Sequence, residues 1–206
     1  MYLITINGID CSGKTTLVSG LKNTFDATGI LLAPHVKTFS NVSVPKRQKL
    51  YASDKSKEFE NFMTEDISLR RIFVLNKMQH GLPIAMDRGD STLLAYIMAK
   101  NFLVQKKTYT ESFVSLKKYF TPICPTLEIF IKVPHEVAME RAKQKGENWG
   151  EGFVELTRNG VDALDFVSQN SSSKLFTVDG TMSTEQVLSK VKNEIELFVS
   201  DRCLLD

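Results

Sequence analysis

"NGIDCSGKTT", residues 7–16, follows five mostly apolar residues and places a glycine-rich turn before a lysine and two threonines. Gly8, Gly13, Lys14 and Thr15 complete the pattern G-x-x-x-x-G-K-[ST]. Glycines let backbone N–H groups close around phosphate oxygens, and the first turn of the following helix adds a positive dipole. A plain strand–turn–helix corner would also use glycines, but it would not require the lysine and the threonine. The stretch therefore predicts a loop that binds the phosphates of a nucleoside triphosphate.

The polar side chains of this loop have separate expected tasks. Lys14 supplies a mobile positive charge, and Thr15 supplies a hydroxyl oxygen for Mg²⁺. The residues expected to bind ATP are Gly8, Asp10, Cys11, Ser12, Gly13, Lys14, Thr15 and Thr16. Motor, switch and kinase proteins all share such a loop, so the acceptor of the phosphate has to be inferred from other residues.

Short apolar runs alternate with longer helical patterns along the rest of the chain, which is typical of a parallel sheet covered by helices. We predict strands at residues 2–6, 30–36, 83–87, 127–133 and 174–179. The expected fold is a single α/β domain over residues 1–206, with a five-stranded parallel sheet flanked by helices.

Two helices have clear sequence signals. After the phosphate loop, Leu17, Leu21 and Phe25 recur every four residues, and Gly29 is expected to end that helix. Near the C-terminus, Ser183 precedes Gln186 by three residues, which is the spacing of a capping box. The apolar residues that follow it with helical period are Val187, Val191, Ile195 and Phe198.

Two polar segments, residues 37–57 and 143–152, are predicted to be loops that can close over a ligand. We interpret the second, KQKGENWGEG, as a short mobile lid.

Bulk composition excludes several functional classes. A formal net charge of +2 over 206 residues gives no basic track for nucleic acid. Cys11, Cys124 and Cys203 are scattered without metal-ligand spacing, which indicates free thiols in a reducing compartment. The N-terminus lacks a signal-peptide pattern, and no run approaches the ~18 apolar residues of a membrane span. We therefore expect a soluble, cytoplasmic protein that does not associate with membranes.

The segments "GIDCSGKTT" and "DRGDSTLLAY", residues 87–96, together resemble the thymidylate kinase family of nucleoside monophosphate kinases. The segment 71–77 is similar to the family's base-binding helix, 125–146 to the strand and helix before its lid, and 176–187 to its last strand and helix. Residues 37–66 and 147–170 align poorly. The resemblance implies transfer of the ATP γ-phosphate to a deoxynucleoside monophosphate, with dTMP as the first candidate acceptor, Mg²⁺ as cofactor and a homodimer as a common assembly.

The resemblance also implies roles for individual residues. Asp87 would orient the water shell of Mg²⁺, although it could instead cap the next helix, a position that suits Asp90 better. Arg88 would clamp the acceptor phosphate with two parallel hydrogen bonds, unless it forms an ordinary surface salt bridge. Asp10 would turn away from the phosphates to the 3′-hydroxyl of the acceptor sugar.

Base recognition is the first departure from the family. Phe73 aligns with an aromatic that stacks on the base, and Tyr96 with a residue that crowds the sugar 2′ position; both would also fit plain core packing. Lys77 stands where the family has an arginine that contacts the pyrimidine. A lysine lacks the planar guanidinium, so a different or relaxed base specificity is an alternative, and so is a solvated Lys77 with no contact.

The catalytic cation is the second departure, because phosphoryl transfer needs a positive charge on the transferred group. The expected catalytic residues are Lys14, Arg88, Arg141 and Lys145. The lid has "NWGE", residues 148–151, where an Asp-Arg pair is usual, so Arg141 and Lys145 could also form a merely solvated basic face. Lys37, Lys46 or Arg47 could replace a missing arginine after the second strand, and Lys132 stands where an aspartate is common.

The residues also bear on two other functions. A nucleoside kinase must remove a proton from a 5′-hydroxyl, and the second predicted strand is followed by no carboxylate for that task. A regulatory nucleotide-binding protein without turnover would explain the altered lid, but it would not need the acceptor clamp at Arg88.

Overall fold

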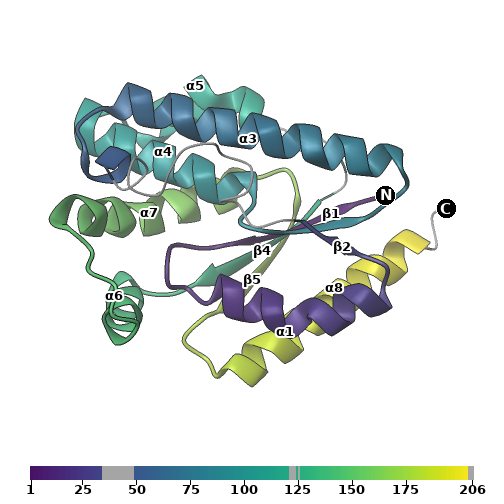
Figure 1. Cartoon of the computed structure of the whole chain (residues 1–206). Coiled ribbons are helices and arrows are strands. Elements are labelled where there is room, and N and C mark those ends of the chain that lie inside the picture. Colours follow the sequence, from purple (N-terminus) through teal and green to yellow (C-terminus); the bar gives the residue numbers. More distant parts are fainter. Residues whose placement is uncertain (34–48, 121–123, 125, 204–206) are drawn as a thin grey trace.

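The computed structural model describes residues 1–33, 49–120, 124 and 126–203 (Figure 1). Its strands are β1 (Leu3–Asn7), β2 (Leu31–Leu32), β3 (Ile84–Asp87), β4 (Thr126–Lys132) and β5 (Lys174–Asp179). They form one sheet in the order β2-β3-β1-β4-β5, and every neighbouring pair is parallel. The predicted five-stranded parallel sheet is confirmed. Four strands begin and end within one residue of the expected positions. The second strand is shorter than predicted, because it ends at Leu32, and residues 34–36 lie outside the described residues.

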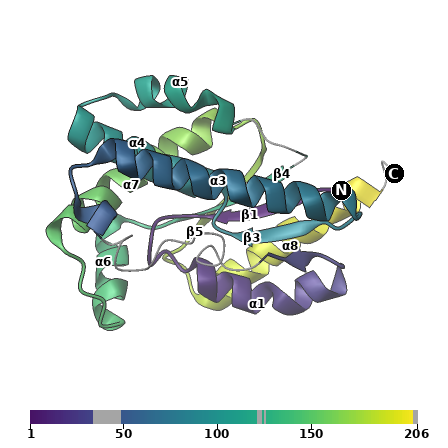
Figure 2. The same cartoon turned by 45° about the horizontal axis from the view of Figure 1, so that its top comes forward.

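Helices cover both faces of the sheet, as Figures 1 and 2 show. They are α1 (Lys14–Ala27), α3 (Ser56–Gln79), α4 (Asp90–Gln105), α5 (Tyr109–Phe120), α6 (His135–Gln144), α7 (Glu151–Asn170) and α8 (Thr184–Cys203). One face carries α1 and α8, and the opposite face carries α3, α4, α5 and α7. Helix α6 stands beyond the carboxyl ends of the strands, beside the phosphate loop.

The core follows the alternation of a strand with two buried faces. In β1, Ile4 and Ile6 belong to the apolar cluster under α1 and α8, whereas Leu3 belongs to a cluster under α3. The predicted stripe of Leu17, Leu21 and Phe25 is buried against the first of these clusters.

Both predicted helix signals are confirmed. Helix α1 ends at Ala27, and Gly29 follows with φ 68°. At the start of α8, Ser183 N donates to Gln186 Oε1 at 3.1 Å, and Gln186 N donates to Ser183 Oγ at 3.3 Å. The four apolar residues predicted to face the core are all buried.

Both predicted loops are shorter than expected within the described part of the chain. Residues 49–52 are helical and α3 begins at Ser56. Helix α6 continues to Gln144 and α7 begins at Glu151, so only residues 145–150 connect them. Charge and glycine content suggested a loop over the whole segment, but Lys143 and Glu151 lie in exposed helix turns and Gly150 is the N-cap of α7.

Among the helices of the described residues, none combines the length and apolar character that crossing a membrane requires. Cys11 and Cys124 are free thiols, as predicted, while the side chain of Cys203 lies outside the described residues.

Candidate functional site

The phosphate loop lies between the carboxyl end of β1 and the first turn of α1. Gly13 is the N-cap of α1 in a left-handed conformation with φ 104°, which a glycine adopts without strain. Gly8 is required for space instead, because a Cβ there would lie 2.5 Å from Ser12 Oγ and 2.9 Å from the carbonyl oxygen of Ile131. Any side chain would therefore be unfavourable at both glycine positions of the motif. The two glycines let the loop fold tightly over the end of the strand.

Lys14 is buried at the centre of this loop, with a relative exposure of 4%. Its Nζ donates to the carbonyl oxygens of Gly8 at 2.9 Å and Ile9 at 2.5 Å, and to Ser12 Oγ at 3.3 Å. Burial and the charge of Arg88 lower the pKa of Lys14 to about 7. The ammonium group is thus held among loop carbonyls, in a position from which a phosphate can attract it.

Thr15 and Asp87 bring a hydroxyl and a carboxylate together beside the loop. Thr15 Oγ1 donates to Asp87 Oδ2 at 3.1 Å. Oxygen ligands of this kind suit Mg²⁺, which usually takes only one or two protein ligands and fills its other positions with phosphates and water. The described residues contain no group of three or more His, Cys, Asp or Glu side chains that could hold a metal ion.

Asp87 does not cap the next helix. Helix α4 has Gly89 as its N-cap, without a side-chain cap from its own chain segment. Asp90, the other candidate cap, pairs with Arg71 Nε at 2.8 Å. The capping alternative for Asp87 and the capping role expected for Asp90 are therefore both wrong.

Asp10, Arg88 and Tyr96 form a connected cluster next to the loop. Arg88 Nη2 forms an ion pair with Asp10 Oδ1, and Tyr96 Oη donates to Asp10 Oδ2 at 2.9 Å. The backbone N–H of Asp10 donates to Tyr96 Oη at 3.0 Å. Arg88 has φ 70°, an unusual conformation for a residue with a side chain, so the fold enforces this placement.

The charged groups of this cluster shift the pKa values of their neighbours. Burial alone would raise the pKa of Asp10, but the charges of Arg88 and Lys14 and the hydrogen bonds from Arg88 and Tyr96 lower this pKa to about 2. Burial, followed by the charge of Asp10, raises the pKa of Tyr96. At neutral pH the site therefore holds an ionised Asp10 and a Tyr96 hydroxyl that stays protonated as a donor.

Arg141 lies on the other side of the phosphate loop. Its Nη1 donates to the carbonyl oxygen of Ser12 at 3.3 Å, and its Nη2 donates to that of Gly180 at 2.7 Å. Lys145, the C-cap of α6, is exposed nearby. A cavity of about 270 Å³ opens here, near the roughly 300 Å³ at which small-molecule pockets begin. Its lining includes Cys11, Ser12, Thr16, Arg141, Lys145, Gly180 and Met182.

The connection between α6 and α7 contacts the phosphate loop. Cys11 Sγ lies 3.8 Å from Glu147 Oε2, and Trp149 Nε1 donates to the same carboxylate oxygen at 2.9 Å. Burial, then the charge of Glu147, raises the pKa of Cys11. The segment predicted as a lid thus contacts the phosphate loop through Glu147.

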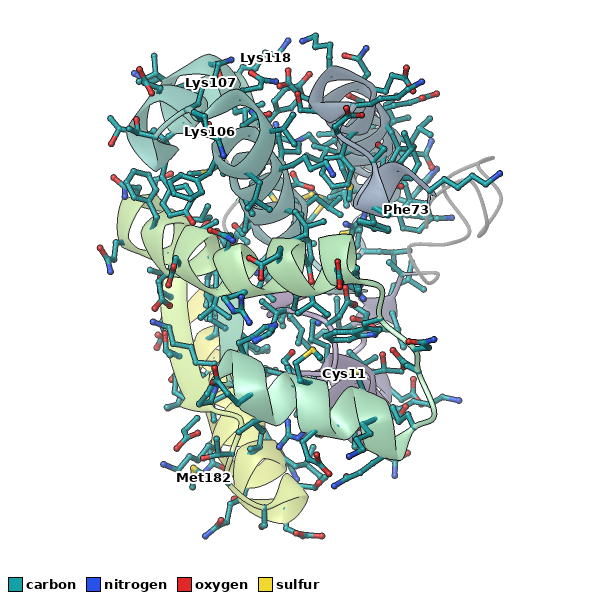
Figure 3. All side chains as sticks on the ribbon, turned by 90° about the vertical axis from the view of Figure 1, so that its left-hand side faces the viewer. Cys11, Phe73, Lys106, Lys107, Lys118 and Met182 are labelled. Atoms are coloured by element: carbon teal, nitrogen blue, oxygen red, sulfur yellow. The ribbon has the colours of Figure 1, made fainter. Side chains whose placement is uncertain are left out.

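Phe73 and Lys77 are not brought to this cluster. Phe73 packs against an apolar cluster that includes Leu3 and Ile84, the first residues of β1 and β3, whereas the phosphate loop and Arg88 follow the last residues of those strands. Lys77 Nζ lies 5.8 Å from the Phe73 ring. Figure 3 shows Phe73 well separated from Cys11 of the loop. The base contacts expected for these two residues therefore have no support from their placement.

Sequence reasoning missed two charged residues on the buried side of α3. Asp66 is 3% exposed and Arg70 is 1% exposed, one helical turn apart. Burial lowers the pKa of Arg70, while the nearby charges include Asp90, Asp66, Arg88 and Asp87. Among the described residues, Nε and Nη1 of Arg70 have no hydrogen-bond partner. The signal was available, because both residues interrupt an apolar stripe with helical period.

A second missed feature is a buried polar network around Asn7 and Glu128, which lie in otherwise apolar strands. Lys132 has a structural role, since its Nζ pairs with Asp165 at 2.7 Å. The remaining candidates, Lys37, Lys46 and Arg47, lie outside the described residues.

Comparison with known proteins places this site in context. No family model matches the chain. A thymidylate kinase from Thermosipho africanus is 25% identical over 212 residues, covering 94% of this chain and 96% of that protein. A probable thymidylate kinase from Archaeoglobus fulgidus is 23% identical over 96% of both chains. A thymidylate kinase from Campylobacter jejuni is 27% identical, covering 95% of this chain and 100% of that protein. Over nearly its full length the chain is therefore similar to proteins named thymidylate kinase.

Solved structures share the fold of this chain. A deoxyadenosine kinase from M. mycoides with bound dATP superposes with a TM-score of 0.68 at 15% identity, over 94% of this chain and 98% of that one. At this identity the likeness concerns the fold alone. The similarity to these kinases over nearly the whole chain indicates that the protein is an ATP-dependent nucleotide kinase, a phosphotransferase.

Proposed function

We propose that this protein is a thymidylate kinase family member that transfers the γ-phosphate of ATP to a deoxynucleoside monophosphate, with dTMP as the first acceptor to test. The relatives supply the name of that acceptor. The observation that carries the proposal is the position of Arg88, a partly buried guanidinium at the end of the strand next to the phosphate loop, paired with Asp10. A protein that only bound ATP would have no use for a second anion site there.

The donor side of the reaction uses the phosphate loop. Loop N–H groups and Lys14 bind the β- and γ-phosphates, which draw the ammonium away from the carbonyls of Gly8 and Ile9. Thr15 and Asp87 would hold Mg²⁺, which neutralises phosphate charge when it is bound. The cavity beside Arg141 is the place for the donor base, and Arg141 or Lys145 would contribute charge to the transferred group.

The acceptor side uses the cluster next to the loop. Arg88 has the geometry to bind a phosphate by two parallel hydrogen bonds. Asp10, ionised at neutral pH, can accept a hydrogen bond from a sugar hydroxyl, and the Tyr96 ring can limit space at the 2′ position. The acceptor phosphate is already an oxygen nucleophile, so the reaction requires no general base.

A kinase for other deoxynucleoside monophosphates is a second candidate. It is favoured by the placement of Phe73 and Lys77 away from the cluster, and by Asp66 and Arg70 on the buried side of α3. A carboxylate there could accept a hydrogen bond from an exocyclic amino group, which thymine lacks.

The test is ADP release with Mg²⁺-ATP and six acceptors: dTMP, dUMP, dCMP, dGMP, dAMP and ribothymidine monophosphate. We expect one deoxynucleotide to stimulate release far above the rate without acceptor. Arg88→Ala should abolish this stimulation while ATP still binds, and Arg158→Ala, which removes an exposed arginine on α7, should not. ATP binding without stimulation by any acceptor would instead support a regulatory nucleotide-binding protein.

Assembly and domain organisation are proposals of the same kind. We propose one domain over residues 1–206, with residues 145–150 as the lid, in a cytoplasmic protein. Helix α3 exposes Leu69, Ile72 and Leu75, a face that suits a homodimer. Light scattering on the purified chain and on Ile72→Glu tests this, and equal masses for the two would reject that surface.

A further inference from the structure

The backbone at Arg88 is unusual in both conformation and support. Its φ of 70° turns the chain sharply between β3 and α4, and its N–H donates to the carbonyl oxygen of Ile6 at 2.9 Å. The next residue, Gly89, is the N-cap of α4 and has no side chain with which to cap the helix. The groups that hold this turn in place must therefore come from another element.

Asn7, the last residue of β1, supplies them. Its Oδ1 accepts from Gly89 N at 3.0 Å, from Thr92 N at 3.3 Å and from Thr92 Oγ1 at 2.9 Å. The absence of a side chain on Gly89 permits this approach, because a Cβ there would lie 2.8 Å from Asn7 Oδ1 and 2.7 Å from Thr5 Cβ. A side chain of the central strand thus caps α4 at the residue after Arg88.

Glu128 on β4 fixes the orientation of this amide. Asn7 Nδ2 donates to Glu128 Oε2 at 3.2 Å and to Thr5 Oγ1 at 3.0 Å. Glu128 also accepts hydrogen bonds from Ser91 Oγ and, at 2.7 Å, from Ser171 Oγ. Because an ionised carboxylate only accepts, it requires the NH₂ group of Asn7 on its side and directs Oδ1 to α4.

The same hydrogen-bond network also includes the phosphate loop, which is the proposed binding site of the phosphate donor. Gly8, the first glycine of the phosphate loop, donates its N–H to Thr92 Oγ1 at 3.3 Å. Asn7 is 0% exposed and Thr92 is 1% exposed, so water does not compete for these hydrogen bonds.

We propose that Asn7 is a positioning residue, oriented by Glu128, that fixes Arg88 relative to the phosphate loop. This inference rests on the proposed function, since Arg88 is taken as the clamp for the acceptor phosphate. Asn7 does not touch the reacting groups. It acts by holding the turn from which the guanidinium projects, and small displacements of such groups lower phosphoryl transfer rates strongly.

Position 7 requires an amide because its side chain must accept hydrogen bonds from the start of α4 and donate one to Glu128. Asn7→Asp would place two carboxylates face to face in a buried site, and they could remain together only by sharing a proton. The damage in this variant should therefore grow as the pH rises and that proton is lost. The double variant Asn7→Asp/Glu128→Gln exchanges the two groups, so that an acceptor again faces α4 and a donor again faces position 7.

The experiment measures ATP affinity and the kcat/KM of the acceptor that is most active in the six-nucleotide panel, between pH 6 and 9. At pH 8 we expect Asn7→Asp to lower acceptor kcat/KM by about 10- to 100-fold, and to affect ATP affinity much less. The double variant should recover to within about threefold of wild type and lose the additional pH dependence. Asn193→Asp, which adds a carboxylate on the exposed side of α8, is the matched control and should behave as wild type.

Three results would overturn the inference while the proposed function stands: acceptor kinetics of Asn7→Asp equal to those of the control, equal losses for ATP and acceptor, or no recovery in the double variant. Thermal unfolding shows whether each variant is folded. If Asn7→Asp does not fold, the double variant decides alone, and a loss of acceptor kcat/KM beyond about tenfold rejects the assignment. If wild type phosphorylates none of the six acceptors, the proposed function is rejected and the assignment with it.

Discussion

Tyr96 and Asp10 hold each other by two reciprocal hydrogen bonds: the tyrosine hydroxyl donates to Asp10 Oδ2 at 2.9 Å and accepts the backbone N–H of Asp10 at 3.0 Å. The tyrosine comes from α4 and the aspartate from the phosphate loop, so the pair joins the two halves of the site. It also orients the carboxylate that pairs with Arg88.

Tyr96→Phe should weaken both stability and acceptor binding. The variant leaves the N–H of Asp10 without its acceptor, which should lower the free energy of unfolding by about 1–3 kcal/mol. The KM of the acceptor should rise because Asp10 is less well oriented. Tyr109→Phe is the control, since that hydroxyl donates to the carbonyl of Asn159 away from the site at 3.1 Å. It should lose stability without a change in acceptor KM; equal KM effects in both variants would contradict the role of Tyr96.

Lys14 should take up a proton when ATP binds. Its pKa of about 7 in the free protein means that at pH 8 most molecules carry a neutral amine. Phosphate oxygens favour the ammonium, so binding raises the pKa and draws close to one proton per site from the buffer. Calorimetry of ATP binding in two buffers of different ionisation enthalpy measures this uptake. Lys14→Met should remove it and Lys22→Met, on the exposed side of α1, should retain it; buffer-independent heats for wild type would refute the prediction.

The stability of the nucleotide-free protein should respond to the same group. Because the folded state binds the Lys14 proton more weakly than the unfolded chain, the unfolded state carries more protons between pH 7 and the ordinary lysine pKa of 10.5. The contribution of Lys14 to the free energy of unfolding therefore rises with pH across this window. Urea unfolding at several pH values should show a steeper rise in wild type than in Lys14→Met. Parallel curves would show that Lys14 is charged throughout.

Asp87→Asn should raise the Mg²⁺ concentration needed for half-maximal turnover. The amide keeps the volume and still accepts from Thr15, but it removes the charge that attracts the cation. We expect kcat to fall by about 100-fold or more at fixed Mg²⁺. Asp26→Asn, on the exposed side of α1, should leave both quantities unchanged. An unchanged Mg²⁺ dependence in Asp87→Asn would exclude this carboxylate from the metal site.

Ser183→Ala tests the capping box of α8 apart from the chemistry. Loss of the hydrogen bond from Gln186 N should lower the free energy of unfolding by about 1 kcal/mol, with kcat unchanged. Ser189→Ala, within the same helix and exposed, should have little effect on stability. Equal unfolding midpoints for the two variants would show that the cap contributes nothing.

The sequence predicted features that depend on residues close together in the chain. The stripe of Leu17, Leu21 and Phe25 and the spacing of Ser183 and Gln186 each occupy one helix, so local periodicity was sufficient. The phosphate loop was likewise predictable because its glycines, lysine and threonine are nearly contiguous.

Features that depend on distant residues could not be predicted in the same way. Helix α3 has 24 residues and apolar side chains on several sides, so its pattern did not show that Phe73 packs beside the first residues of β1 and β3. The partnership of Asn7 with Glu128 spans 121 positions and arises only because β1 and β4 are neighbours.

The pairing of β1 with β3 has a consequence for how this protein can diverge. Ile6 on β1 is in register with Asp87 on β3, so the phosphate loop and Arg88 begin within two residues of paired positions on strands about 4.8 Å apart. The hydrogen bonds between these two strands therefore fix the distance between the groups that bind the donor and acceptor phosphates. Side chains on α3 and α4 can change to admit another base while this distance stays the same, so new substrate preferences can evolve without changes to the phosphate-binding residues.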